Sequence, residues 1–446
     1  METGEGLGAP ETVRRLQTAL HVKAKGDPGF RFYTLSDKVW REDVMAAAWQ
    51  AVRRNGGACG VDGETFQHIE ERGVDGWLGG LAEELRENTY RPHAVRQVLI
   101  PKKQPGKFRP LGIPCIRDRV AQTAATLVLT PIFEADLQPE QYAYREGRSA
   151  LDAVRHAHRL VNTGHGEIVD GDLSNYFGEI PHTELIKSIA RRVSDGRMLG
   201  WIKLWLEMAV VEDDGKGGQR RTNRARRERK GTPQGAPISP LLSNVYMRRF
   251  LLGWKLLGLA RRFGAEIVNY ADDFVICGKA PAEAMRAAVE RIMGKLRLPL
   301  NATKTHCLRT PEEPFEFLGY RIGRNYSPRT GRAYIGTRPS KASVRSICRK
   351  ISELTRARYG LLAPELVVAR LNRAMLGWAN YFRLGQVSPA YCAVDAHAVK
   401  RLRQWLCRKH KVQSGRYVRY PSERLWDDFG LVRLQLLTAS FPWAKT

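Results

Sequence analysis

The sequence predicts an α+β fold that ends in a region of basic helices. Two patterns indicate this class. From about residue 96 onwards, short apolar runs typical of strands alternate with longer stretches of helical spacing. After Arg338 the spacing is helical and acidic residues become rare. The length of 446 residues suits about two to four modules with enough apolar content for a core.

The expected elements follow in chain order. A helix should begin at Ser36 and stop at Asn55-Gly56-Gly57, because a capping residue precedes early acidic residues and glycines end the pattern. The expected strands are 95–101, 167–169, 266–270 and 274–277. The expected helices are about 117–135, 149–163, 182–211 and 281–297. Residues 215–230 hold eight Lys or Arg and one acid among polar residues, which indicates an exposed, solvated connector rather than a dedicated binding site.

The charge of the chain points to a polyanionic partner. Lys and Arg exceed Asp and Glu by 27, which implies nucleic acid first. A membrane surface would also attract this charge, but the N-terminal residues lack the apolar run of a signal peptide and no stretch of about 18 apolar residues occurs. We therefore expect no membrane partner and a cytoplasmic, nucleoid-associated protein. The seven cysteines are scattered and never form a C-x-x-C pair, so they indicate neither a disulfide framework nor a zinc site.

Two segments place carboxylates beside apolar strands. In residues 266–278, Asp272 and Asp273 stand between two apolar runs, as at the tip of a hairpin, and an earlier apolar run leads into Asp170 and Asp172 on one strand face. Paired aspartates are common turn formers. Next to a buried sheet, however, their charge would be costly without divalent cations. Two magnesium ions about 4 Å apart need oxygens from separate segments, which these two runs supply.

These two segments resemble the palm motifs of reverse transcriptases, whose signature Tyr-x-Asp-Asp occurs at 270–273. The resemblance implies a right-hand polymerase with fingers and palm, an antiparallel palm sheet plus helices, and then an α-helical thumb. It also implies that Asp172, Asp272 and Asp273 hold two Mg²⁺ ions and act in catalysis. Lys304 is then expected to donate a proton to the leaving pyrophosphate, although a lysine there could touch only the backbone.

Two further segments resemble the parts of a reverse transcriptase that hold the incoming nucleotide. Residues 101–114 are similar to the fingers motif, in which a Lys and an Arg seven residues apart bind the triphosphate; the resemblance assigns Lys102 and Arg109. A point charge and a bidentate fork suit phosphate oxygens, whereas the segment alone would indicate a solvated basic loop. Residues 231–247 (GTPQGAPISPLLSNVYM) resemble the motif under the template, in which Gln234 would bond near the nucleotide.

The resemblance also implies contacts to the sugar and the primer. An aromatic residue five positions after the first catalytic aspartate, here Phe177, is expected to be a steric gate against the C2′ face of the sugar, with a core aromatic as the alternative. Residues 315–321 (FEFLGYR) resemble a motif that closes the palm. The residues expected to grip the primer end are Phe317, Leu318, Gly319 and Tyr320.

The segments that flank the palm are similar to group II intron-encoded proteins. Residues 55–66, 141–156 and 371–385 carry this resemblance, which extends over about 35–434. Two departures stand out: Tyr-Ala-Tyr-Arg at 142–145 replaces the more usual Phe-Gly-Phe-Arg, and Gly-Ala replaces Gly-Gly at 235–236. The chain ends without a His-Asn-His and paired-Cys nuclease module, so we expect no independent cleavage of the second DNA strand.

A basic helical region is expected to bind RNA. Residues 341–420 hold 17 Lys or Arg and three acids, with an apolar stripe on one helical face and cations on another. The arginines expected to contact RNA are Arg345, Arg349 and Arg356. The expected division of the chain is an N-terminal extension and start of the fingers (1–95), fingers and palm (96–335), helical thumb or maturase domain (336–412), and a short nucleic-acid-binding segment without an endonuclease (413–446).

The predicted function is RNA-directed DNA polymerisation by a nucleotidyltransferase. An RNA template, a DNA primer and dNTPs would be its substrates, and group II intron RNA and a DNA target its further partners in splicing and retromobility. Two alternatives stay open: an RNA-binding splicing cofactor without essential polymerase activity, and a domesticated enzyme in host defence or CRISPR spacer acquisition. A flanking intron with a domain V hairpin would distinguish mobility from domestication.

Overall fold

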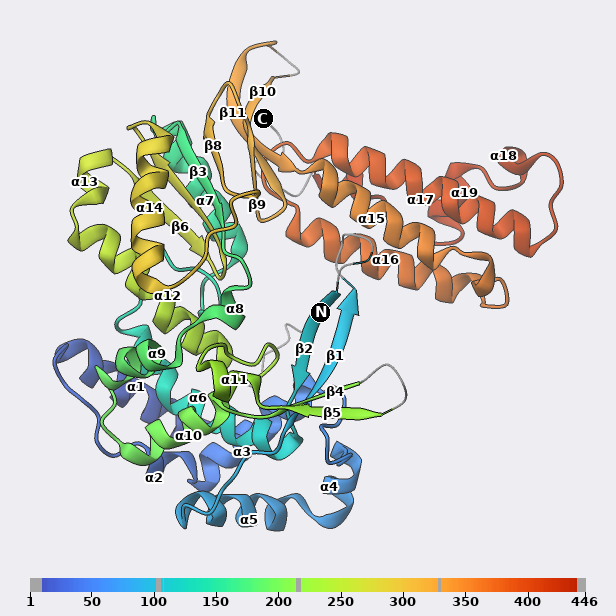
Figure 1. The fold of residues 1–446 in the computed structure, drawn as a ribbon. Helices are drawn as coiled ribbons and strands as arrows, with labels where there is room; N and C mark the ends of the chain where they lie inside the picture. The colour runs from blue at the N-terminus through green and yellow to red at the C-terminus, as the bar shows by residue number, and fades with distance from the viewer. Residues whose placement is uncertain (1–9, 102–105, 107, 214–217, 328–329, 439–446) are drawn as a thin grey trace. The chain divides into compact units, whose positions relative to one another are not determined.

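The computed structural model describes residues 10–438 except 102–105, 107, 214–217 and 328–329, and it divides into two compact units (Figure 1). The first unit comprises Met1–Arg148, Asp172–Gly258 and Ala288–Asn301. The second comprises Ser149–Gly171, Leu259–Ala287 and Ala302–Thr446. Each unit therefore combines segments that are distant in sequence. Among the described residues, no helix is both long enough and apolar enough to cross a membrane.

The first unit is built around a buried helix, α6. Its helices are α1 (Glu11–Gly26), α2 (Ser36–Val39), α3 (Glu42–Asn55), α4 (Phe66–Arg72), α5 (Val74–Arg86), α6 (Ile116–Glu134), α8 (Tyr176–Glu179), α9 (His182–Ala190), α10 (Gly196–Leu206), α11 (Arg224–Glu228) and α12 (Ser239–Leu256). Helices α1, α2, α3 and α12 pack against α6. Consecutive residues of α6 from Asp118 to Gln122 are buried, so the helix is covered on all sides.

One sheet of the first unit joins four strands in the order β2-β1-β4-β5. They are β1 (Val95–Pro101), β2 (Phe108–Ile113), β4 (Val210–Asp213) and β5 (Gln219–Thr222). Strands β1 and β2 are antiparallel, β4 runs parallel to β1, and β5 returns antiparallel to β4. The prediction of a loop for 215–230 is therefore wrong over β5 and α11. Residues 214–217 lie outside the described part of the chain.

Two predicted helices are interrupted. The helix expected from Ser36 to Asn55 is split, because Arg41 is extended (φ −59°, ψ 137°) and a new helix begins at Glu42. The stretch 182–211 forms α9 and α10 and then enters β4. The break before α10 has a clear cause: the Asp195 carboxylate accepts the N–H of Met198 at 3.0 Å and the N–H groups of Leu35 and Ser36 at 2.7 Å each.

The second unit contains two sheets. Its first sheet has the order β6-β7-β3-β8, and its second has the order β11-β10-β9. The strands are β3 (Glu167–Asp172), β6 (Glu266–Tyr270), β7 (Asp273–Gly278), β8 (His306–Arg309), β9 (Phe315–Phe317), β10 (Tyr320–Tyr326) and β11 (Ala333–Pro339). The helices beside them are α7 (Ala150–Asn162), which packs on β6, β7 and β11, α13 (Leu259–Phe263) and α14 (Ala282–Leu296). The last residue of β3 and the C-terminal part of α14 belong to the first unit.

The C-terminal part of the second unit is helical, as expected. It contains α15 (Lys341–Leu354), a 3₁₀ turn (Ala357–Tyr359), α16 (Pro364–Tyr381), α17 (Ser388–Lys409), α18 (Arg416–Arg419), α19 (Ser422–Asp427) and α20 (Leu434–Leu437). Helices α15, α16 and α17 pack on one another (Figure 1). Ile351, Leu371, Leu402 and Trp405 are among the buried residues of their core. The predicted α+β class with a helical end is confirmed.

Candidate active site

The paired aspartates lie at the tip of a β-hairpin. Tyr270 pairs with Asp273, so Ala271 and Asp272 form a two-residue turn between β6 and β7. Ala271 has a φ of +58°, the left-handed conformation that such turns require. The Nδ2 of Asn269 donates to the carbonyl of Ala271 at 2.9 Å and to that of Asp273 at 3.3 Å. Asp272 is half-buried and Asp273 is exposed, while both strands are apolar and mostly buried.

Strand β3 lies next to this hairpin in the sheet, and Asp172 is its last residue. The strand neighbours β7, and a Cβ at Gly171 would overlap the ring of Phe274, so the two strands touch there without any intervening side chain. Asp172 follows Gly171 directly, and Asp273 precedes Phe274.

The half-buried carboxylate of Asp172 is also tied to its own unit. The Nδ2 of Asn301 donates to Oδ2 of Asp172 at 3.1 Å, and the backbone N–H of Asn301 donates to the Asp172 carbonyl at 2.9 Å. The neutral amide holds the carboxylate in place without supplying a positive charge.

A cavity of about 600 Å³ in the first unit gathers three residues expected to bind nucleotide, Arg109, Phe177 and Gln234. The Nε of Arg109 donates to Oε1 of Gln234 at 3.0 Å, and the N–H of Gly112 donates to the Gln234 carbonyl at 2.6 Å. Gly235 has a φ of +110°, and a Cβ there would collide with the Gly112 carbonyl, so glycine is required at this close approach. The volume falls within the range of about 300–1,000 Å³ typical of small-ligand sites.

The aromatic residue Phe177 is both packed and part of this cavity wall. Its ring is 7% exposed and contacts Tyr176 edge-on, with ring centroids 5.6 Å apart. The N–H of Thr232 donates to the Phe177 carbonyl at 2.7 Å, which fixes the ring's backbone. A rigid ring at the wall is compatible with a steric gate and with a packing role. Lys102 lies outside the described residues.

Residues 100–322, half of the chain, match the family model "Reverse transcriptase (RNA-dependent DNA polymerase)". The chain belongs to the reverse transcriptase family. A second model, "Group II intron, maturase-specific domain", matches residues 344–421 of this reverse transcriptase. These matches identify a group II intron-type reverse transcriptase and imply RNA and DNA as its partners.

Curated relatives agree with this assignment. Protein YkfC of Escherichia coli (strain K12) is 33% identical over 354 residues, which cover 71% of this chain and 89% of YkfC. The group II intron-encoded protein LtrA of Lactococcus lactis subsp. cremoris is 30% identical over 345 residues, covering 63% of this chain and 55% of LtrA. The chain thus spans about half the length of LtrA. A solved partial Cas6-RT-Cas1–Cas2 complex has a TM-score of 0.36 and 24% identity, covering 59% of this chain and 42% of that one.

Enzymes of this family use divalent metal ions. The donors present fit such ions, because aspartate oxygens are the hard ligands that Mg²⁺ prefers. The exposure of Asp273 and the partial exposure of Asp172 and Asp272 leave room for water ligands, which Mg²⁺ retains in proteins. Carboxylates on two adjacent strands, rather than on one turn, also suit a site for more than one ion.

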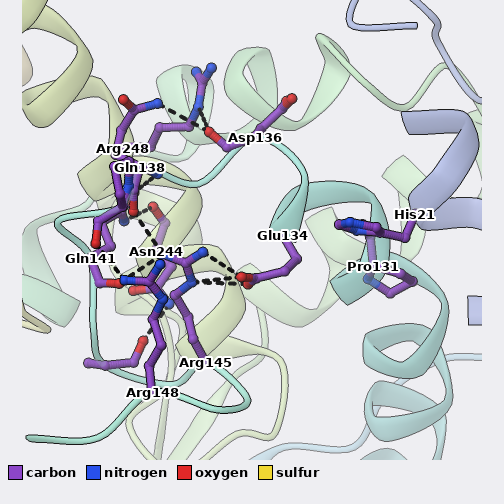
Figure 2. Close-up of polar contacts among 12 residues, drawn as sticks. His21, Pro131, Glu134, Asp136, Gln138, Gln141, Arg145, Arg148, Asn244 and Arg248 are labelled. Atoms are coloured by element: carbon purple, nitrogen blue, oxygen red, sulfur yellow. Dashed lines mark hydrogen bonds and ion pairs between the residues drawn. The ribbon is translucent and has the colours of Figure 1, made fainter. Parts of the chain in front are cut away.

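The turn at 142–145 contributes a residue that sequence analysis did not single out. Tyr144 lines the same cavity as Arg109, is 52% exposed and has a φ of +58°. The next residue, Arg145, donates from Nε to Glu134 at 2.9 Å and from Nη1 to the carbonyls of Gln138 and Gln141 at 2.7 and 2.8 Å (Figure 2). The one sequence signal at this turn was the departure from the usual Phe-Gly-Phe-Arg.

The segment expected to grip the primer forms a hairpin between β9 and β10. Phe317 is 2% exposed and Tyr320 is fully buried, so their side chains pack the second unit. The turn residues Leu318 and Gly319 have φ values of +51° and +80° and are half-buried. The Oη of Tyr381 donates to the Leu318 carbonyl at 2.9 Å. Contact with a primer would therefore come from the turn and not from the two aromatic rings.

Tyr381 links the end of α16 to the aspartate hairpin within the second unit. Burial, together with the nearby Tyr270 and the charge of Asp273, raises the pKa of Tyr381 to about 12. The phenol therefore remains a neutral donor at physiological pH. Lys304 is exposed in the turn that precedes β8.

The predicted RNA-binding arginines occupy one face of α15 and the turn after it. Arg345, Arg349 and Arg356 are exposed, whereas Ile347 and Ile351 on the opposite face are buried. The predicted amphipathic pattern of this helix is therefore confirmed. Two aromatic residues of the helical region, Trp405 at 1% exposure and Tyr391 at 0%, pack its core.

A second group of possible ligands lies elsewhere in the first unit. Asp62, His93 and Cys115 have ligand atoms within 4.8 Å of one another. Burial raises the pKa of the Cys115 thiol to about 12, and the thiol is hydrogen-bonded to Asp62. A thiol must lose its proton to bind a metal, so the contacts favour a hydrogen-bonded cluster.

Proposed function

We propose that this reverse transcriptase copies RNA into DNA from dNTPs by two-metal nucleotidyl transfer, with Asp172, Asp272 and Asp273 holding two Mg²⁺ ions. The supporting observation is the packing of Gly171 on Phe274, because it joins the end of β3 to the start of β7. When bound, the ions would activate the primer 3′-hydroxyl and stabilise the charge on the leaving pyrophosphate.

The remaining roles belong to side chains of the cavity and the palm. Arg109, whose Nε is engaged by Gln234, has its terminal guanidinium N–H groups left to bind the triphosphate. Lys102 would add a second positive charge. The Phe177 ring would exclude a 2′-hydroxyl, and Lys304 would protonate pyrophosphate as it leaves. Each role is separable by substitution, because the residues lie on different elements.

The decisive experiment replaces the carboxylates with amides of equal size. Asp172→Asn and Asp273→Asn should each abolish primer extension on RNA in Mg²⁺, because an amide lacks the charge that binds the ion. Melting temperature and affinity for primer–template should stay near wild type. Asp37→Asn, at an exposed helix start, is the matched control and should extend primers normally. Wild-type extension by both site variants would show that the assigned site is wrong.

We also propose that the helical region binds group II intron RNA and that the enzyme supports splicing and insertion at a DNA target. The maturase-specific match and the exposed arginines of α15 support this proposal. In the proposed division, residues 96–335 carry out polymerisation and residues 336–412 bind RNA. The proposed location is the cytoplasm, where both the intron RNA and the DNA target would be accessible. Splicing of a transcript that carries the flanking RNA, with and without protein, tests it.

A further inference from the structure

The conformation of Tyr144 is unusual for its residue type. A φ of +58° is disfavoured by contacts of Cβ with the backbone, and bulky residues rarely adopt it. Turns that need this conformation generally use Gly, Asn or Asp. Tyr144 is nevertheless 52% exposed, so burial of the ring in the core does not account for a tyrosine here.

Buried polar contacts on both sides hold the turn in this shape (Figure 2). Before Tyr144, the Nδ2 of Asn244 on α12 donates to the Ala143 carbonyl at 2.8 Å, and Asn244 is 2% exposed. After it, the Arg145 side chain, 5% exposed, is paired with Glu134 at the end of α6. A strained residue persists where its surroundings over-determine it, and such residues cluster at ligand sites.

The Tyr144 ring lies at the wall of the cavity described above. Tyr144 lines the cavity that holds Arg109, Phe177 and Gln234. Of the described residues lining that cavity, Tyr144 and Phe177 are aromatic, and Phe177 is 7% exposed. Tyr144 therefore offers the accessible aromatic surface of the cavity, while Arg109 offers its positive charge. A nucleotide presents the matching groups, since every base has a π-face that stacks on aromatic rings.

We propose that Tyr144 is a nucleobase-binding residue of this cavity, with its ring as the stacking surface. The proposal rests on the nucleotide-binding function proposed for the same cavity. The stacked base would belong either to the templating strand or to the incoming dNTP. Stacking on the tyrosine ring is the same interaction in both cases. The strained backbone has a function in this view: it directs a large ring into the cavity from a tight turn.

The test measures single-nucleotide incorporation by Tyr144→Phe, Tyr144→Leu and Tyr144→Gly. The Leu and Gly variants should lose about ten-fold in kcat/KM, the factor that corresponds to a base–aromatic stack of ordinary strength. The Phe variant should retain wild-type kcat/KM, because its ring is the same. The Gly variant should melt at or above the wild-type temperature, because glycine relieves the positive φ. Loss of activity with unreduced stability separates base binding from folding.

A matched control is Tyr33→Leu, which removes a tyrosine of the same unit that is 69% exposed and does not line the cavity. Templates with an abasic site distinguish the two sources. If the ring stacks on the templating base, the difference between wild type and Tyr144→Leu disappears on the abasic template. If it stacks on the incoming base, the difference persists there. Both results support base binding.

Two results would overturn the proposal. Wild-type kcat/KM in both the Leu and Gly variants would show that Tyr144 only occupies the turn. A Phe variant as impaired as the Leu variant would show that the hydroxyl, not the ring, is used. Failure of the wild-type chain to extend any primer would instead contradict the proposed function of the whole cavity.

Discussion

The contact between Gly171 and Phe274 makes a sharp prediction for Gly171→Ala. A Cβ at position 171 would lie 2.5 Å from Cε2 and 2.8 Å from Cε1 of the ring, with Cζ closer still, whereas ordinary contact begins at 3.4 Å. The Phe274 ring is fully buried and cannot swing into solvent. Strands β3 and β7 must therefore separate by about 0.9 Å or more, and this displaces the C-terminal end of β3 relative to the start of β7.

The expected effect on rate is larger than the effect on stability. Overpacking of this kind costs about 1–3 kcal/mol of unfolding free energy. Misplacement of reacting groups by about 1 Å lowers the rate on the order of 100-fold. Single-turnover primer extension, at a temperature well below the melting point of every variant, measures the second quantity, and thermal or urea unfolding measures the first.

Two further variants make the test specific. Gly200→Ala in α10 is the matched control, because a Cβ there meets no atom within 4 Å and alanine favours the helix. The double variant Gly171→Ala, Phe274→Leu should recover part of the lost rate, because the smaller side chain frees space, and the coupling should exceed about 0.5 kcal/mol. Wild-type extension by Gly171→Ala alone would refute the inferred dependence of the site on the close contact between Gly171 and Phe274.

Three other predictions concern Phe177, the arginines of α15 and the turn after it, and Asp195. Phe177→Val should raise ribonucleotide incorporation relative to dNTPs by roughly ten-fold or more, and unchanged selectivity in an active variant would reject the steric gate. Replacing Arg345, Arg349 and Arg356 by Gln should flatten the dependence of log RNA affinity on log salt by about two to three units and impair assisted splicing, while extension of a short primer at low salt persists; an unchanged slope with normal splicing would show a merely solvated face. Asp195→Ala should cost about 3 kcal/mol, measured by urea unfolding, because three backbone N–H groups lose their acceptor. Against the opposing effect of burial, these N–H groups hold the pKa of that carboxyl below its ordinary value, so its contribution is full above pH about 4 and is lost as the pH falls through the lower folded-state pKa.

Local patterns predicted the aspartate hairpin well. Strands β1 and β6 have the bounds that the apolar runs indicated, and the hairpin tip carries Asp272 and Asp273 as expected. For β6 the reason is burial on both faces, so its composition alone separates it from the flanking turns. Strand β1 is mostly exposed, and its bounds follow from its apolar run rather than from burial. The amphipathic helix α15 was predicted equally well, because one face packs and the other is charged.

Pairing between distant segments was not predictable in this way. Strand β5 was taken for a loop because its sequence, Gln-Arg-Arg-Thr, has no apolar residue. It is a strand because β4 continues the sheet from β1 through the parallel pair Val95 and Val210, more than a hundred positions apart. Ladder hydrogen bonds therefore outweighed propensity, as is common at sheet edges.

The proposed site also contains backbone conformations that local rules disfavour. Among the described residues, eight that are not glycine adopt a positive φ, and three of these, Tyr144, Ala271 and Leu318, lie in segments assigned to nucleotide, metal or primer. A left-handed conformation costs such residues roughly 1–2 kcal/mol each. The sequence therefore predicted the aspartate hairpin itself but not the backbone conformations of these turns.

In each of these three turns a side chain donates to a backbone carbonyl at the strained position or directly before it. Asn244 donates to the carbonyl before Tyr144, Asn269 to that of Ala271, and Tyr381 to that of Leu318. Each hydrogen bond gives a backbone carbonyl the donor that it would otherwise lack inside the protein. A buried carbonyl left unpaired would cost about as much free energy as the left-handed conformation itself. Two of the three donors lie at least 60 positions from their acceptors, so only the folded chain brings them together. The unusual turns are thus products of tertiary structure. Contacts with the core of each unit hold the backbone in conformations that the local sequence disfavours, and these conformations set the direction of the side chains in the turns.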